Sequence, residues 1–360
     1  MSNDDYRIVT VNVSQTVGAI PSTLQQTGVI ISNGATTLAA KTPTLITSYA
    51  EFTAIANDTA ATYAAVNAAV TTFFAQGNSL GIYIMEVGAV VDAGIDAVAA
   101  YMADPDVRFY TYQVPVAWDG NAKLVTLGRN NSANTSMVYF FIDTDATAAK
   151  YHYKTIKSFV PTQKSSDPAI CNSAAAMWQF ISASPSDINK VPPMAFRYLI
   201  GVVALVAKGS VKTLLTTNYV NYVGTGAEGG ISNTVYFNGM SADGNDLTYW
   251  YSVDWIQINV QMALANEIIN GSNNPINPLY YNQDGINRLQ NRAQGVFNSG
   301  VTFGLVNGNP VVGAVPFRTY VKNNPNDYKI GRYAGLSAEY TPMRGFMKII
   351  FNVNVTMQLS

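Results

Sequence analysis

The chain has one cysteine and one histidine among 360 residues, and charged side chains make up only 12% of it. A single thiol, Cys171, excludes an internal disulfide, so we expect the fold to depend on packing alone and to form in a reducing cytoplasm. With His152 as the one imidazole, a histidine metal site or a Ser-His-Asp triad has one candidate at most. The net charge of −1 gives no field that would attract nucleic acid or an anionic membrane.

Long apolar runs are also absent. The longest, residues 198–207, lies between Arg197 and Lys208 and is too short to cross a bilayer, so it predicts a buried helix or strand. The N-terminal residues MSNDDYR are acidic and polar, whereas a secretory signal is basic and then apolar. We therefore expect no export signal and no membrane insertion.

Apolar side chains are plentiful, at 48% of the residues with 11% aromatics, which is enough for a sizeable core. The charged share is about half of the usual ~25%. A surface with so little charge is typical of a subunit that is largely covered by copies of itself.

The first half of the chain alternates between strand and helix patterns, which predicts an α/β layered domain. Expected strands are residues 28–32, 44–48, 80–87, 107–114 and 137–142, and expected helices are residues 59–76, 92–102 and 120–129. A further helix is expected at residues 167–181, with Asp167 as its N-cap.

The second half predicts an α+β unit. Residues 224–246 are rich in Gly and Asn and indicate a loop and hairpin with a short strand near Val235. Long helices are expected at residues 253–269 and 284–298, ended by Gly271 and Gly300. Strands are expected at residues 301–306, 311–320, 336–340 and 346–359. The fold class is therefore α/β and α+β, with layered sheets flanked by helices and extended β-arms at both ends.

No residue pattern supports catalysis, and we expect no cofactor and no metal. Cys171 reads as a small buried hydrophobe. The glycines at 224, 226 and 229 spell GxGxxG, but no helix opens after them, as a dinucleotide site requires. Asp104 and Asp106 indicate a capped turn, and residues 243–246 lack the glutamate of a calcium loop. The four tryptophans (118, 178, 250 and 255) are expected in core or interface packing.

Both ends of the chain alternate between polar and apolar residues, as β-strands do. The last strand would reach roughly 45 Å at about 3.3 Å per residue. It either completes the sheet of its own domain or joins an exposed sheet edge of a neighbour. The apolar positions of the two arms, with Tyr6 at the start of the first, are Tyr6, Val9, Val11 and Val13, and Met347, Ile349, Phe351, Val353, Val355, Met357 and Leu359.

Three strings resemble contractile phage tail sheath proteins: TPTLITSYAEFTAI, TTFFAQGNSLGIYIMEVG, and YVKNNPNDYKIGRYAGLSAEYTPMRGFMKIIFNVNV. They are similar to that family's strand and Ser-x-x-x-Phe motif, its Phe-Phe-x-x-Gly turn, and its Asn-rich turn before a long final strand. Residues 143–245 match least. The resemblance divides the chain into an N-terminal arm (1–24), an α/β sheath domain (25–205), an α+β domain facing the tube (206–345) and a C-terminal arm (346–360).

The resemblance implies a structural subunit and not an enzyme. Such subunits stack in six-fold rings around an inner tube, are linked through their terminal strands, and contract to drive the tube through the host envelope. The implied partners are other copies of the chain, the tail tube protein, and baseplate and neck or terminator proteins. The implied location is the virion, after synthesis in the bacterial host cytoplasm. A sheath-like baseplate or tail-completion protein, or an enzyme with an undetected site, remain the alternatives.

A local excess of positive charge suggests where the tube would bind. Residues 318–348 hold six basic side chains and two acidic ones, a net +4 in a chain of −1 overall. The family's C-terminal domain lines the lumen, so we predict that this region faces an acidic tube surface. The predicted tube-facing residues are Arg288, Arg292, Lys322, Lys329 and Arg332.

Overall fold

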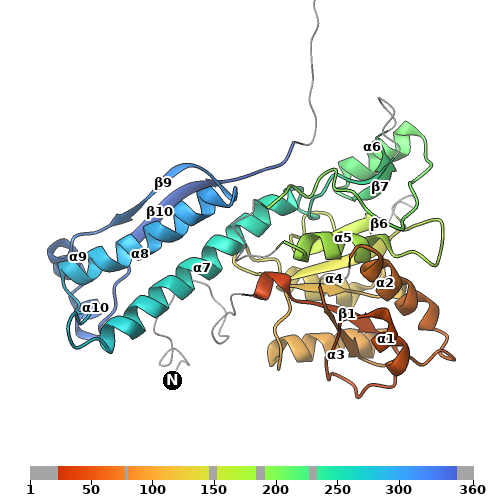
Figure 1. The fold of residues 1–360 in the computed structure, drawn as a ribbon, viewed down its shortest axis with the longest axis horizontal. Coiled ribbons are helices and arrows are strands. Elements are labelled where there is room, and N and C mark those ends of the chain that lie inside the picture. Colours follow the sequence, from red (N-terminus) through yellow and green to blue (C-terminus); the bar gives the residue numbers. More distant parts are fainter. Residues whose placement is uncertain (1–22, 78–79, 146–151, 184–190, 227–232, 347–360) are drawn as a thin grey trace, which may run out of the picture.

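The computed structural model describes residues 23–77, 80–145, 152–183, 191–226 and 233–346. A body built on a six-stranded sheet occupies one side of the molecule, and a long pair of helices extends away from it (Figure 1). The fold is mixed α/β and α+β with layered sheets and helices, as the sequence predicts.

The six-stranded sheet has the order β2-β3-β1-β4-β5-β6. Its neighbours are parallel except for β2, which is antiparallel to β3 at one edge. Parallel strands are covered on both faces, so their sequences are nearly continuous apolar runs. The strands are β1 (Gly28–Ser32), β2 (Thr44–Ile46), β3 (Ile82–Glu86), β4 (Thr111–Gln113), β5 (Tyr139–Thr144) and β6 (Phe159–Gln163).

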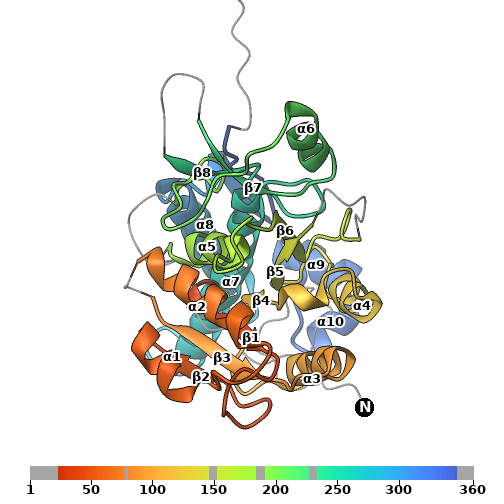
Figure 2. The same ribbon diagram turned by 90° about the vertical axis from the view of Figure 1, so that its right-hand side faces the viewer.

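Successive residues of each strand enter two different cores. In β5, Tyr139 and Phe141 join the core under α2 and α5, whereas Phe140 and Ile142 join the core under α3 and α4. Figure 2 shows these two helix pairs on opposite sides of the sheet. The helices of this body are α1 (Tyr49–Ile55), α2 (Tyr63–Ala75), α3 (Val91–Ala103), α4 (Ala122–Asn130) and α5 (Asn172–Ile181), with short 3-10 turns at Leu24–Gln26 and Val116–Trp118.

A buried carboxylate holds the start of α5 against the end of β5. The Asp143 side chain accepts hydrogen bonds from the backbone N–H groups of Ser173 (2.8 Å) and Asn172 (3.2 Å). Burial raises the pKa of Asp143 to about 6, although these hydrogen bonds oppose the rise. The sequence predicts Asp167 as the N-cap of this helix, but Asp143 occupies that place. The Asp167 side chain accepts a hydrogen bond from the Ala169 N–H in a turn before α5.

The second part of the molecule is a helical hairpin with a two-stranded ribbon on it. Helix α7 (Leu247–Ser272) and helix α8 (Gln283–Thr302) are joined by a short loop, and the antiparallel strands β9 (Val306–Ala314) and β10 (Leu336–Pro342) lie along α8. Two short helices, α9 (Phe317–Asn323) and α10 (Pro325–Lys329), connect the two strands at the far end of the hairpin (Figure 1).

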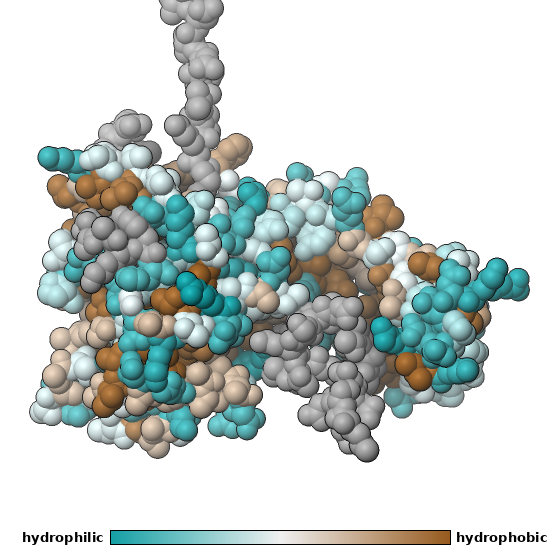
Figure 3. All heavy atoms as spheres, turned by 180° about the vertical axis from the view of Figure 1, so that it is seen from behind, coloured by the Kyte–Doolittle hydropathy of each residue, from teal (hydrophilic) through white to brown (hydrophobic). Residues whose placement is uncertain are grey.

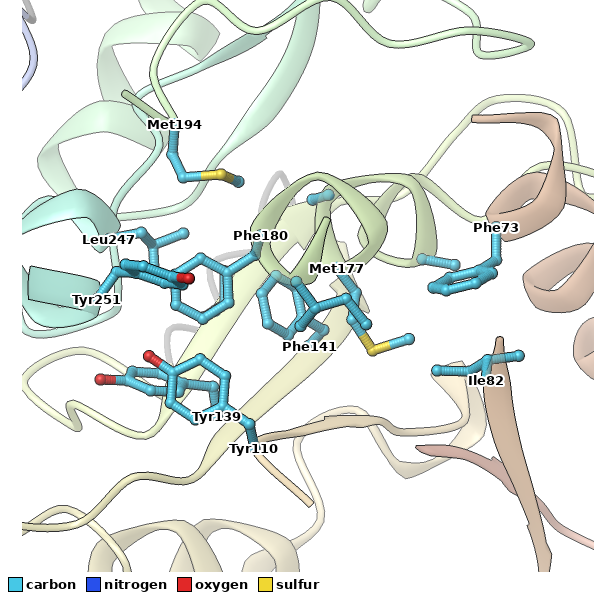
Figure 4. Packing of buried hydrophobic residues seen from close by; sticks show 14 of the residues in the cluster. Phe73, Ile82, Tyr110, Tyr139, Phe141, Met177, Phe180, Met194, Leu247 and Tyr251 are labelled. Atoms are coloured by element: carbon cyan, nitrogen blue, oxygen red, sulfur yellow. The ribbon is translucent and has the colours of Figure 1, made fainter. Parts of the chain in front are cut away.

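Helix α7 belongs to both parts. Its 26 residues span about 39 Å at 1.5 Å per residue. The first half is buried against the sheet body: Leu247 and Tyr251 contact the same core as Tyr110, Tyr139 and Phe180 (Figure 4). The hydroxyls of Tyr110, directly before β4, and of Tyr139, in β5, both donate to Asp254 at 2.8 Å. The second half pairs with α8 beyond the body.

The remaining elements border the sheet at β6. Helix α6 (Gly209–Thr217) precedes a hairpin of β7 (Tyr222–Thr225) and β8 (Thr234–Phe237), as the Gly- and Asn-rich sequence predicts. The apolar run at 198–207 is neither a helix nor a strand, so that prediction is wrong. Several of its side chains are exposed, among them Tyr198, Ile200 and Val206.

Most predicted elements of the sheet body are confirmed within a few residues, and β6 is the strand that was missed. Its Pro161 weakens the strand pattern, and the structure places it on the last strand of the sheet, where proline is tolerated. The boundary predicted at residue 205 stays a prediction. The predicted arm positions at residues 6–13 and 347–359 lie outside the described residues.

In the second part, four predictions of element boundaries are wrong. Gly271 and Gly300 lie inside α7 and α8, because each lets another segment approach the helix: an added Cβ would meet Leu279 at 2.4 Å or Val306 at 2.9 Å. The strand predicted at 301–306 is the end of α8 and the start of β9. The strand predicted at 311–320 ends at Ala314, and α9 follows.

We expect Asp143 to make stability depend on pH. Its folded-state pKa of about 6 lies above the ordinary value of 3.8, so the folded state binds the proton more tightly. Lowering the pH from 7 to 5 should therefore raise the free energy of unfolding by about 1 kcal/mol through this group. Asp143→Asn should abolish that gain in urea denaturation, whereas Asp106→Asn, on an exposed turn, should retain it. An equal pH response in wild type and Asp143→Asn would contradict this assignment.

Candidate assembly surfaces

The ribbon of β9 and β10 is the part of the fold to which a further strand could be added. Its register pairs Ser337 with Gly313 and Glu339 with Val311. The pairing is irregular near Tyr340: Glu339 pairs with Val311, but Thr341 pairs with Asn307, so β9 contains extra residues at this point. Gly308, with φ of +75°, lies among them. The Val315 N–H donates to the Gly335 carbonyl. In an antiparallel pair, such bonds recur at every second residue, so the odd-numbered residues of β10 direct their backbone N–H and C=O groups toward β9.

The residues of β10 with even numbers therefore point their backbone groups away from β9. We call this row, the N–H and C=O groups of Leu336, Ala338 and Tyr340, the β10 edge. Among the described residues, no hydrogen bond joins the β10 edge to any other group. Unpaired backbone groups along a strand are a template for another strand.

The outer row of β9, which we call the β9 edge, is occupied. Gln294 of α8 accepts from the Val312 N–H (2.9 Å) and donates to the Pro310 carbonyl (2.9 Å). Gln290, one turn earlier on the same helix, donates to the Val312 carbonyl at 2.7 Å. Two glutamine side chains thus satisfy the groups that a further strand would need.

The chain itself covers most other sheet edges. Backbone hydrogen bonds connect β8 to residues 196–199, β7 to Leu205 and β6 to Asn221. At the opposite edge of the large sheet, β2 has three residues and follows Pro43. Short edges next to proline resist strand addition. Among the described strands, the β10 edge is the long one that remains uncovered.

The chain leaves β10 through a fixed point at residues 343–345, which we call the arm root. The Gly345 N–H donates to Asp246 at 2.8 Å, and Asp246 is also the N-cap of α7. Arg344 donates to Asn245 at 3.0 Å and lies over the ring of Tyr249 at 4.8 Å. The residues that resemble part of a calcium loop in sequence therefore anchor α7 and the arm root.

Two predicted tube-facing residues, Arg288 and Arg292, have a partner inside the chain. Arg288 and Arg292 of α8 both contact the Glu267 carboxylate of α7, at 2.6 and 3.2 Å. Arg288 also donates to the carbonyl of Asn277 in the loop between the helices, at 3.1 Å. Because Glu267 is largely buried, this cluster holds the α7–α8 hairpin together, and much of its positive charge is neutralised.

The other predicted residues lie at the far end of the hairpin. Four exposed cations, Arg318, Lys322, Lys329 and Arg332, surround α9 and α10, and we call them the basic tip. No acidic side chain of the described residues lies within ion-pair distance of them. Hydrophilic residues gather over this end of the molecule (Figure 3). Ring contacts among five aromatic residues connect the segments of the tip: Tyr281, Phe317, Tyr320, Tyr328 and Tyr333.

No arrangement of side chains suited to catalysis was found in the described residues. Cys171 is buried, as predicted, and His152 lies against Gly120. Within the same residues, no group of three or more His, Cys, Asp or Glu side chains is placed to hold a metal ion, and no helix has the length and hydropathy to cross a membrane. An open groove of about 560 Å³ between α7 and α8 is lined by amides and apolar groups, with Arg292 as its charged residue.

Comparisons with known proteins bear on the fold. No protein-family model and no curated protein matches the chain. A chain in the six-fold symmetrised baseplate of the anti-feeding prophage matches with a TM-score of 0.68 and 12% identity, covering 99% of this chain and 100% of that one. A chain in the contracted helical sheath of the same prophage has a TM-score of 0.62, 12% identity, and coverage of 98% and 100%.

The sheath tail protein of Listeria innocua matches with a TM-score of 0.55 and 8% identity, over 90% of this chain and 97% of that one. At such low identities the likeness establishes the fold alone. The chain has the fold of tail sheath proteins over nearly its whole length, as the sequence resemblance predicts.

We expect the Glu267 cluster to contribute to the stability of the hairpin. Glu267→Gln would leave two arginines without a counter-charge, one of them with 28% of its side chain exposed, and should cost about 1 to 2 kcal/mol of unfolding free energy. Asp96→Asn is the control, since it removes a carboxylate from a pair that is exposed on both sides and should change the melting temperature far less. Equal effects of both variants would show that the cluster contributes no more than a surface pair.

Proposed function

We propose that this chain is a structural subunit of a contractile phage tail sheath. Its copies polymerise into a six-fold helical cylinder around the inner tail tube, and contraction drives the tube through the host envelope. The observation that carries the proposal is the likeness of nearly the entire chain to sheath proteins, one of them in a contracted helical sheath. The role is structural, and the virion tail is its location after synthesis in the host cytoplasm.

The terminal arms supply the links between subunits in this proposal. The sequence gives each arm an apolar face, and a strand of this kind needs a partner for its backbone groups. The β10 edge, which has no hydrogen-bond partner among the described residues, would offer such a partner in every copy. Burial of the seven apolar side chains of the C-terminal arm would contribute at most about 10 to 20 kcal/mol, at ~1.5 to 3 kcal/mol each. Links of this strength persist while other subunit faces change partners.

The partners in this proposal are further copies of the chain, the tail tube protein, and the baseplate and neck or terminator proteins. Contact with the tube is made by the basic tip, since its cations are exposed and without acidic partners among the described residues. Arg288 and Arg292 contribute through the position of the hairpin, because Glu267 already neutralises part of their charge.

A second candidate is a baseplate subunit with the sheath fold. The match with a TM-score of 0.68 comes from a baseplate assembly, which favours this alternative. The two functions differ in self-assembly. Negative-stain electron microscopy of the purified protein should show hollow cylinders for a sheath subunit, whereas single rings without helical growth indicate the baseplate role. A monodisperse monomer at high concentration would contradict the sheath proposal.

We predict that the C-terminal arm is required for polymerisation and not for folding. Deletion of residues 346–360 should give a chain with a native circular dichroism spectrum and melting curve that forms no cylinders. Phe351→Asp with Val353→Asp should do the same, because it places two charges on the apolar face at a cost of several kcal/mol.

The matched control is Asn352→Asp with Asn354→Asp, which adds the same charge to the polar face of the same arm and should leave cylinders intact. Unfolding of the truncated chain would assign the arm to the core of its own subunit. Cylinders formed by the truncated chain would exclude the arm as a link.

We also predict that the basic tip binds the tube. Lys329→Glu with Arg332→Glu should weaken co-sedimentation with the purified tube protein at low salt, because a rim charge acts through a screened attraction. Lys208→Glu with Lys212→Glu, at the N-cap and in the first turn of α6, makes the same change of charge elsewhere and should leave co-sedimentation unchanged. Equal binding by both variants would place the tube contact outside the basic tip.

A further inference from the structure

We infer that the carboxyl-terminal edge of the six-stranded sheet holds an anion-binding site, and that the side chain of Glu86 is the ligand that occupies it. The site lies where β1 and β3 end side by side, with Ser32 paired to Glu86. It takes a carboxylate through neutral hydrogen-bond donors. The inference is independent of the proposed function, since it concerns the sheet body and not the contacts between subunits.

The Glu86 carboxylate is surrounded by donors from the loops that follow β1 and β3. Each of its two oxygens accepts three hydrogen bonds, four from backbone N–H groups and two from hydroxyls in all. The donors to Oε1 are the N–H groups of Gly34 (2.6 Å), Gly88 (2.7 Å) and Val87 (3.0 Å), and those to Oε2 are the Ser32 hydroxyl (2.6 Å) and the hydroxyl (2.9 Å) and N–H (3.1 Å) of Thr36. A carboxylate has about four lone-pair sites, so this one is fully bonded.

Dipoles, and not a cation, balance the charge of Glu86. Within the described part of the chain, no lysine or arginine lies at ion-pair distance from it, and the residue is only 5% exposed. Burial raises the pKa of this carboxyl, but the donors outweigh burial and hold the pKa below its ordinary value. Fixed neutral donors around a buried negative charge are the means by which proteins bind anionic ligands.

Two glycines give the backbone the shape of such a site. Gly34 has φ of +93° and Gly88 has φ of +82°, a region that other residues rarely adopt. A left-handed residue next to an ordinary one turns successive N–H groups to the same side, which forms a concave nest for an anion. The successive N–H groups of Val87 and Gly88 both donate to Oε1.

The site lies where sheets of this topology receive their ligands. In open α/β sheets, ligands bind outside the carboxyl ends of the strands, at the point where the strand order reverses. Here β1 lies between β3 and β4, so the order reverses at β1. The resident carboxylate uses all the donors named above, and it therefore closes the site to an anion from solution.

The loop after β1 keeps its shape through bonds that do not involve the Glu86 side chain. The Asn57 N–H donates to the Ala35 carbonyl at 2.8 Å, and the Thr37 N–H donates to the Ile55 carbonyl at 2.8 Å, so the end of α1 holds this loop. The Val87 N–H also donates to the carbonyl of Ser32 at 2.9 Å. We therefore expect the donors to stay in place without the carboxylate and to accept a small free carboxylate instead.

The test removes the resident carboxylate and supplies a free one. Glu86→Ala deletes a CH₂–COO⁻ group, which has the size of an acetate ion. The variant should melt below wild type, and sodium acetate at about 100 mM should raise its melting temperature by about 2 °C relative to sodium chloride at the same concentration. Acetamide has the same shape without the charge and should have far less effect.

The matched controls are wild type, whose site is filled, and Glu339→Ala, which removes an exposed carboxylate from β10. Acetate should change their melting temperatures no more than chloride does. Equal effects of acetate on all three proteins would be those of a salt on any protein and would overturn the inference. Glu86→Ala that responds equally to acetate and acetamide, or to neither, would overturn it as well.

A second variant and a second measurement cover the case in which Glu86→Ala does not stay folded. Its yield on refolding should then be about tenfold higher in acetate than in chloride or acetamide, and equal yields would contradict the site. Glu86→Gln fills the same space with a neutral amide, so it should melt below wild type and gain nothing from acetate. Stabilisation of Glu86→Gln by acetate to the same extent as Glu86→Ala would show that acetate binds elsewhere.

Discussion

The contact between the first half of α7 and the sheet fixes the position of everything beyond it. Leu247 and Tyr251 share one core with Tyr110 and Tyr139. The hydroxyls of Tyr110 and Tyr139 both donate to Asp254. Burial raises the pKa of Asp254 to about 6, with the charge of Lys157 opposing the rise. A carboxylate in such a site is stable only with its donors in place. The ribbon and the basic tip are therefore joined to the sheet body through a helix whose first half is held at this contact.

This anchoring explains how a ribbon of two strands stays folded beyond the sheet body. An isolated hairpin is marginally stable in water. Here α8 supplies a packed face for β9 and two glutamines for its edge, and Phe297 supports Tyr340 of β10. The same helix that stabilises the ribbon also occupies the β9 edge, whereas the β10 edge has no partner within the part of the chain that the structure describes. Proteins usually cover such an edge, and one that stays uncovered on a supported ribbon is suited to a defined partner strand.

The sequence predicted the sheet body well because its signals are local. Periodic apolar runs, such as Gly28–Ser32, and Ala-rich helices are confirmed close to their predicted bounds. The predictions that are wrong concern residues whose role depends on contacts with residues far away in the sequence. Gly271 and Gly300 read as helix stops, yet each accommodates a neighbouring segment inside a helix. The role of Asp143 as a cap depends on a residue 30 positions away, and the pairing of Arg288 with Glu267 depends on the hairpin. The glutamine contacts to β9 carry no sequence signal, since glutamine on a helix surface is ordinary.

In the proposed function, a sheath subunit changes its packing without losing its neighbours. A change between two packings requires a small free-energy difference, so the faces that exchange partners cannot each hold many strong ion pairs. A chain with 12% charged residues and exposed apolar side chains such as Ile200 and Val206 meets that condition. In the same proposal, the contacts between subunits that persist need many strong interactions, which a long row of backbone hydrogen bonds and a buried apolar face would supply. By tying the arm root to Asp246 at the start of α7, the fold connects residues 343–345 directly to the helix that packs against the sheet body.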